Sequence, residues 1–145
     1  MPTRLPLPLS SSRDLFEKLK RDAALLNEEV TTDQFFNFVI TGYSLIDWVR
    51  KDPEITGVDV QALYSNPVLK ICGDLANAGK HFELDKRSPV TKSVSSKQGW
   101  GVGRYGRGGY GVGEEEITIE LNDGTQISFL GFVRDVVAVW AAFFP

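Results

Sequence analysis

The fold is decided by the stretch TTDQFFNFVITGYSLIDWVRKD, residues 31–52, which predicts one long helix with apolar side chains on nearly every side. Thr31 and Gln34 have the spacing of a capping box, in which two side chains satisfy free backbone amides of the first turn. Pro53 predicts the helix end, because the residue before a proline disfavours helical conformation. A helix that is apolar nearly all round is buried, so we expect this one at the centre of the fold. Its main apolar stripe is Phe35, Val39, Gly42, Ile46 and Val49, and its other apolar residues are Phe36, Phe38, Ile40, Leu45 and Trp48. Its polar line is Asn37, Thr41, Ser44 and either Asp47 or Lys51.

Three amphipathic helices are predicted to surround this central one. The first covers residues 11–29 and begins with a capping box between Ser11 and Asp14. The second covers residues 67–84 and the third covers residues 132–144. In each, apolar residues recur at the spacing that places them on one helix face. These faces are Leu15, Phe16, Leu19, Ala23 and Leu26 in the first, Val68, Cys72, Leu75, Gly79 and Phe82 in the second, and Phe132, Val136, Val139, Trp140 and Phe143 in the third.

Between the last two helices lies a segment of different composition. Residues 88–113 hold eight of the fourteen glycines, and such a segment buries too little surface to offset the entropy of ordering it. We therefore expect a flexible Gly-rich loop there. Residues 115–130 follow with two alternating segments around Asp123-Gly124, which is a strong turn signal for a β-hairpin. The predicted fold class is mainly α, a four-helix bundle with this loop and hairpin inserted before the last helix.

The length and composition limit the organisation and the location of the protein. The chain has 145 residues, which predicts one domain, and we place it at residues 11–145 after an extended, proline-rich tail at residues 1–10. A single cysteine and a single histidine exclude an intrachain disulfide and make a zinc site implausible, so no metal or cofactor is expected. No apolar run is long enough for a signal peptide or a membrane span. We therefore expect a cytoplasmic protein without membrane contact.

The Gly-rich loop allows two interpretations. Six basic and no acidic residues lie between Lys86 and Gly113, so Arg104 and Arg107 could contact phosphates while Trp100 and Tyr105 stack on the bases of RNA. Alternatively, the loop is a connector whose aromatic residues fold back on the helices. The GVGRYG match at residues 101–106 lacks the preceding strand and following helix of a dinucleotide site, and we reject that interpretation.

A polar line on the predicted helix 67–84 supplies the candidate site. Its residues follow at spacings of four, three and four, which places them on one narrow stripe nearly opposite the apolar face. The stripe predicts either a ligand-binding groove or a solvated helix surface. Its members are Lys70, Asp74, Asn77 and His81.

The segment ANAGKH, residues 76–81, resembles the motif of the HEPN superfamily (higher eukaryotes and prokaryotes nucleotide-binding). HEPN domains are four-helix bundles, usually dimeric, and many are metal-independent ribonucleases whose motif is an arginine, a polar residue, a spacer and a histidine. Asn77 and His81 match the catalytic polar and histidine positions, but Ala76 stands where the arginine belongs. A site without the guanidinium lacks the group that would hold the scissile phosphate. The order of elements also resembles small HEPN-like proteins of bacteria and their phages.

Three functions follow as hypotheses from these patterns. The first is a catalytically degenerate HEPN-like module that binds RNA or a protein partner, in a mobile-element or defence setting. The second is an active metal-independent endoribonuclease that uses His81, with Lys80 or another basic residue in place of the arginine. The third is a structural or interaction protein that binds no nucleic acid. A homodimer is expected from the resemblance and from the large apolar residues near the chain end, such as Trp140 and Phe144.

Overall fold

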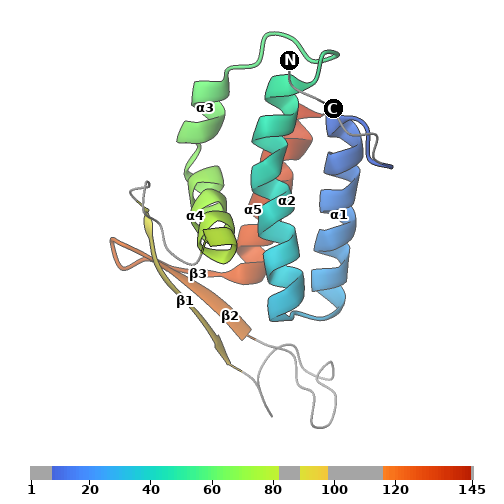
Figure 1. Cartoon of the computed structure of the whole chain (residues 1–145). Helices are drawn as coiled ribbons and strands as arrows, with labels where there is room; N and C mark the ends of the chain where they lie inside the picture. Colours follow the sequence, from blue (N-terminus) through green and yellow to red (C-terminus); the bar gives the residue numbers. More distant parts are fainter. Residues whose placement is uncertain (1–7, 82–88, 98–115, 145) are drawn as a thin grey trace.

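The chain folds into four long helices, a short helix and a three-stranded antiparallel sheet, as seen in a computed structural model that describes residues 8–81, 89–97 and 116–144 (Figure 1). Side chains 79–81, 96 and 97 also lie outside the description. The mainly α fold with a hairpin before the last helix is confirmed. The elements are α1 (Ser12–Glu28), α2 (Thr32–Lys51), α3 (Val60–Ser65), α4 (Pro67–His81), β1 (Thr91–Lys97), β2 (Glu116–Leu121), β3 (Gln126–Ser128) and α5 (Phe129–Phe143).

Helix α2 lies at the centre, as predicted, with α1 on one side, α4 on the other and α5 behind it (Figure 1). The whole predicted stripe from Phe35 to Val49 is buried. The expectation that α2 is apolar and buried nearly all round is wrong for one side, where Phe36 is 38% and Ile40 is 43% exposed. No helix covers that side among the residues described, so two large apolar side chains face outward.

A close crossing of four helices forms the middle of the core. A Cβ atom on Gly42 of α2 would lie 3.1 Å from both Cys72 Sγ in α4 and Val136 Cγ1 in α5, and 3.6 Å from Leu19 Cδ1 in α1. The absence of a side chain at this position therefore lets the helices approach one another. The Trp140 indole Nε1 donates a hydrogen bond to the Gly42 carbonyl at 3.1 Å, which joins α5 to α2. Cys72 is fully buried, as expected from its apolar surroundings.

The two predicted capping boxes differ in the structure. At α1 both halves are present, because Ser11 Oγ accepts from the Asp14 amide at 3.1 Å and Asp14 Oδ2 accepts from the Ser11 amide at 3.2 Å. At α2 only the Thr31 half is present, because Thr31 Oγ1 accepts a hydrogen bond from the Gln34 amide at 3.2 Å. The Gln34 Oε1 atom is buried without a hydrogen-bond partner, so the second box is only half formed.

The α1 cap leads to a pH-dependent prediction. Backbone hydrogen bonds from Ser10 and Ser11 lower the pKa of the Asp14 carboxyl. A carboxyl group whose pKa is lower in the folded state stabilises the protein at pH values above its unfolded pKa of about 4. This contribution to stability is lost as the pH falls through the folded pKa. We expect Asp14→Ala to be less stable than the wild type at pH 7, and we expect this difference to shrink as the pH falls from about 5 toward the folded pKa. Urea unfolding across this range measures it, and a difference that stays the same as the pH falls would contradict the assignment.

The sheet corrects the predicted loop and the predicted last helix. Residues 91–97 of the expected Gly-rich loop form β1, which pairs antiparallel with β2. The hairpin turn at Asp123-Gly124 is confirmed, with Gly124 in the left-handed conformation at a φ of 89°. Strand β3 ends at Ser128, whose side chain caps α5, so that helix begins three residues earlier than predicted. Residues 98–113 of the loop and residues 1–7 of the tail lie outside the described residues.

Within the described parts of the chain, no helix combines the length and the apolar character needed to cross a bilayer. The longest, α2, has 20 residues and contains Asp33, Asp47, Arg50 and Lys51.

Candidate functional site

The described residues of the polar stripe of α4 differ from one another in their surroundings. Asp74 is only 2% exposed, and its Oδ2 accepts hydrogen bonds from the Val90 amide at 2.9 Å and the Thr91 amide at 3.0 Å. Asn77 Nδ2 donates to the Gly73 carbonyl of its own helix at 2.8 Å. Lys70 is exposed on the surface. The described part of the stripe is therefore divided, because the start of β1 packs on α4 at Asp74.

The buried face of α4 is also wider than predicted. It includes Ala76, which is only 7% exposed. The position where the HEPN motif has its arginine is thus part of the core. The side chains of Lys80 and His81, and all of Trp100, Arg104, Tyr105 and Arg107, lie outside the described residues. The buried apolar side chains of α4 are Leu69, Ile71, Cys72, Leu75 and Ala76.

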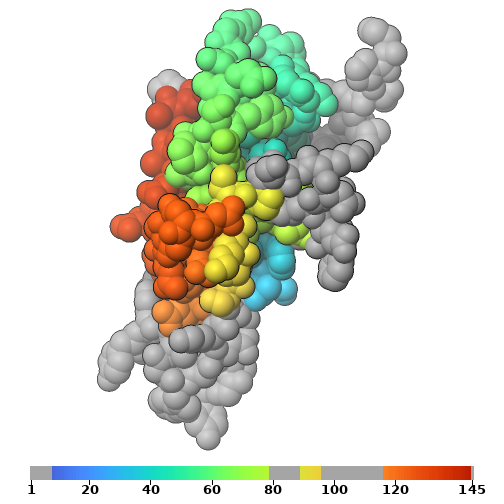
Figure 2. Space-filling view, turned by 90° about the vertical axis from the view of Figure 1, so that its left-hand side faces the viewer, coloured from blue at the N-terminus to red at the C-terminus, as the bar shows by residue number. Residues whose placement is uncertain are grey.

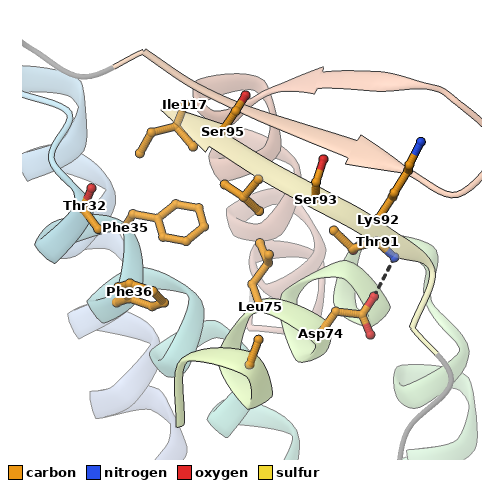
Figure 3. A pocket seen from close by; sticks show the side chains of 12 residues that line it. Thr32, Phe35, Phe36, Asp74, Leu75, Thr91, Lys92, Ser93, Ser95 and Ile117 are labelled. Atoms are coloured by element: carbon orange, nitrogen blue, oxygen red, sulfur yellow. Dashed lines mark hydrogen bonds between the residues drawn. The ribbon is translucent and has the colours of Figure 1, made fainter. Parts of the chain in front are cut away.

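A half-open pocket lies beside β1, between the start of α2 and the second half of α4 (Figure 3). Its volume is about 430 Å³. Three buried apolar side chains from three elements form its inner wall, namely Phe35 of α2, Leu75 of α4 and Ile117 of β2. Thr32, Phe36 and Ala78 complete the helical side. Its apolar wall suits a hydrophobic group of a ligand.

Strand β1 forms the remaining wall with consecutive residues from Thr91 to Ser95. Neighbouring side chains of a strand point to opposite faces, so five in a row can line one cavity only where the edge of the strand borders it. The space-filling view agrees, because β1 lies at the surface with β2 and β3 on one side and the start of α2 and the end of α4 on the other (Figure 2). The pocket therefore combines apolar side chains with a strand edge.

Exposed apolar side chains gather around this pocket. Phe36 and Val94, the latter 39% exposed, line it directly. Ile40 lies one helical turn from Phe36 on the same side of α2. The fourth large apolar side chain that is exposed in the described residues, Leu25, belongs to α1. Clustered exposed apolar groups beside a cavity are typical of a binding surface.

Two charged side chains line the pocket, and only one is accessible. The Asp74 carboxylate is buried and holds the start of β1 through its two backbone hydrogen bonds. Lys92 is exposed, and its Nζ lies 4.0 Å from Glu120 Oε2, so this ion pair is loose. Among the residues that line the pocket, the exposed charged residue is therefore Lys92, whose ammonium points away from the cavity toward β2 (Figure 3).

Two residues of the polar line of α2, Asn37 and Thr41, take part in a network with α1 that the sequence did not reveal. Lys18 Nζ of α1 lies 2.6 Å from Asp22 Oδ2, 3.1 Å from Asn37 Oδ1 and 2.9 Å from Thr41 Oγ1. Asn37 Nδ2 also donates to Asp22 Oδ1 at 3.1 Å. The polar groups of these residues hydrogen-bond to one another, and the network therefore joins α1 to α2. The sequence does place Lys18 one helical turn from Asp22, which indicates an ion pair on α1. It does not indicate that this pair contacts α2.

Comparison of the chain with models of protein families, with curated proteins and with solved structures found no match. In the described residues, no three histidine, cysteine, aspartate or glutamate side chains come together as a metal site would require. The pocket beside β1 is thus the feature on which a functional argument can be built.

Proposed function

We propose that this chain is a catalytically inactive, HEPN-like module that binds a protein partner, and that the partner docks at the pocket between α2, α4 and β1. The observation that carries the proposal is that the exposed side chains of Phe36 and Val94 line a pocket whose inner wall is apolar, with the exposed Ile40 one helical turn from Phe36. Protein interfaces have an apolar centre with a polar rim. The pocket has this composition, with Thr32 and Lys92 beside the apolar wall.

Two observations favour binding over RNA cleavage. The burial of Ala76 places the motif's missing arginine position in the core, away from any surface that a phosphate reaches. The carboxylate of Asp74 is engaged with the backbone of β1 instead of facing a groove. Binding of a protein segment needs neither group, and it needs an apolar cavity that a side chain can enter.

The proposed docking site can be tested by a substitution that fills the pocket. Ala78 is half-buried, lies on α4 and lines the pocket, so Ala78→Leu adds a larger side chain to the cavity without disfavouring the helix. Ala138 of α5 is exposed and does not line the pocket, so Ala138→Leu is the matched control. Random heptapeptides displayed on phage are selected on the immobilised full chain, and the enriched peptide is synthesised with a fluorescent label.

We expect Ala78→Leu to weaken binding of this peptide at least about tenfold, which corresponds to about 1.4 kcal/mol, and Ala138→Leu to leave it unchanged. Fluorescence anisotropy measures both. Equal affinity for the wild type and Ala78→Leu would refute the docking site. A failure to enrich any peptide, together with salt-dependent binding of a labelled single-stranded RNA, would favour the RNA-binding hypothesis instead.

A further inference from the structure

We infer that the partner contributes an extended segment that pairs with the outer edge of β1 as a fourth strand, places one apolar side chain in the pocket and sets a carboxylate near Lys92. This inference rests on the proposed function, and it adds the conformation and the chemistry of the bound segment. Addition of a strand to an exposed sheet edge is a recurring mode of peptide recognition, in which main-chain hydrogen bonds supply affinity and a pocket supplies specificity.

The register of the sheet identifies which groups of β1 face outward. The Leu121 amide donates to the Thr125 carbonyl at 2.9 Å, so Leu121 directs its backbone groups toward β3. Backbone direction alternates along a strand, and Thr118 and Glu120 consequently face β1. Their partners Ser95 and Ser93 face β2. Val94 lies between these two serines, so its N–H and C=O groups point to the outer edge.

No described strand pairs with this outer edge, because β1 is the terminal strand in the order β1-β2-β3. The pocket and the edge coincide at Val94, which lines the cavity and has outward backbone groups. A segment that pairs with Val94 therefore runs directly over the pocket mouth. Since alternate side chains of a strand point to one face, this segment can direct a side chain into the cavity while its neighbours point away.

Charge selects the chemistry of the segment. The sequence of β1, TKSVSSK, has two lysines and no acidic residue. Lys92 is the exposed charged residue of the pocket lining, and its ammonium lies on the side of β1 that faces Glu120 of β2 (Figure 3). A carboxylate within two residues of the apolar side chain would meet Lys92. Pairing of β1 with β1 of a second copy would bring four lysines together, and like charges on paired strands are destabilising. An acidic segment of another protein therefore fits this edge better than a second copy does.

The probe is a fluorescein-labelled heptapeptide, Thr-Glu-Thr-Phe-Thr-Glu-Thr, titrated against the full chain by fluorescence anisotropy. Five further peptides each carry one N-methyl group on an internal backbone amide, which removes one hydrogen-bond donor. A strand presents alternate amides to each edge, so strand pairing predicts an alternating profile. We expect losses of at least about tenfold at every second position and less than about twofold at the positions between.

Protein variants test the charge. Lys92→Glu is expected to weaken binding of the acidic probe at least about fivefold and to favour a version with lysines in place of the two glutamates. Lys70→Glu makes the same change at another exposed lysine, on α4 and outside the pocket lining, and it is expected to leave both affinities unchanged. Circular dichroism of both variants confirms that the helices remain folded.

The outcomes separate this inference from the proposed function. If N-methylation weakens binding equally at every position while binding still depends on Ala78, the added strand is refuted. The docking pocket would then remain supported. Indifference of the probe to both Ala78→Leu and Lys92→Glu would overturn the strand inference and the docking site together, as would the absence of binding by any peptide. A dimer in light scattering that dissociates when the probe is added would assign the edge to a second copy and overturn the choice of an acidic partner.

Discussion

An Ala76→Arg protein is expected to be less stable than the wild type by about 3 to 5 kcal/mol, the usual cost of an uncompensated buried charge. In the HEPN motif that residues 76–81 resemble, this position is an arginine. In this chain Ala76 is buried in the core on α4, so the guanidinium would have to displace packed side chains or remain without a partner. Urea unfolding followed by circular dichroism measures the loss.

Ala78→Arg is the control, because this residue is two positions away on the same helix and lines the open pocket. Its guanidinium can reach water, so we expect a change of less than about 1 kcal/mol, as for most surface substitutions. An Ala76→Arg protein that is as stable as the wild type would contradict the burial argument. If it also cleaved RNA in the presence of a metal chelator, the ribonuclease hypothesis would replace the proposed binding function.

A Trp140→Ala protein is expected to lose about 3 to 5 kcal/mol of unfolding free energy, the range measured for removing a large aromatic side chain from a core. Trp140 is fully buried and packs against Phe143 and Phe144, with ring centroids at 5.7 and 6.2 Å. Its indole also holds α5 to the Gly42 carbonyl of α2. Removal therefore leaves a cavity and separates two helices. The midpoint of urea unfolding reports the loss.

Two variants divide this effect into its parts. Trp140→Phe keeps most of the apolar volume but removes the indole donor, and we expect it to cost about 1 to 2 kcal/mol. Trp48→Ala removes the same side chain type from a half-buried position on α2, so its loss should be clearly smaller than that of Trp140→Ala. Equal losses at positions 48 and 140 would show that the buried crossing is not the main source of stability.

The helices could be predicted from the sequence because the information for each is local. The apolar spacing of α2, the Ser11–Asp14 box and Pro53 each depend on residues within about one or two turns. Strand β1 was missed because its serines and lysines carry no strong strand signal, and its structure comes from pairing with β2, which begins 19 residues after β1 ends. Local composition could not indicate that pairing.

The candidate site was less predictable than the fold for the same reason. Asp74 is polar and lies at helical spacing from Lys70, so the sequence indicated either a ligand-binding groove or a solvated surface. In the structure, the tertiary contact with Val90 and Thr91 buries Asp74. The pocket takes its lining from α2, α4, β1 and β2. No short segment contains more than part of that lining. Phe36 was predicted to be buried, because its exposure depends on which side of α2 the other helices leave uncovered.

The junction at Ser128 couples the sheet to the rotational phase of α5. This residue pairs with Thr118 as the end of β3, and its hydroxyl accepts a hydrogen bond from the Gly131 amide as the cap of α5. No intervening loop can absorb a change in register between the strand and the helix. Since each helical residue advances by about 100°, one residue inserted there would turn the apolar face of α5 by more than a quarter of a revolution. The hairpin thus fixes the rotation of α5 about its axis, and this rotation brings Trp140 to Gly42.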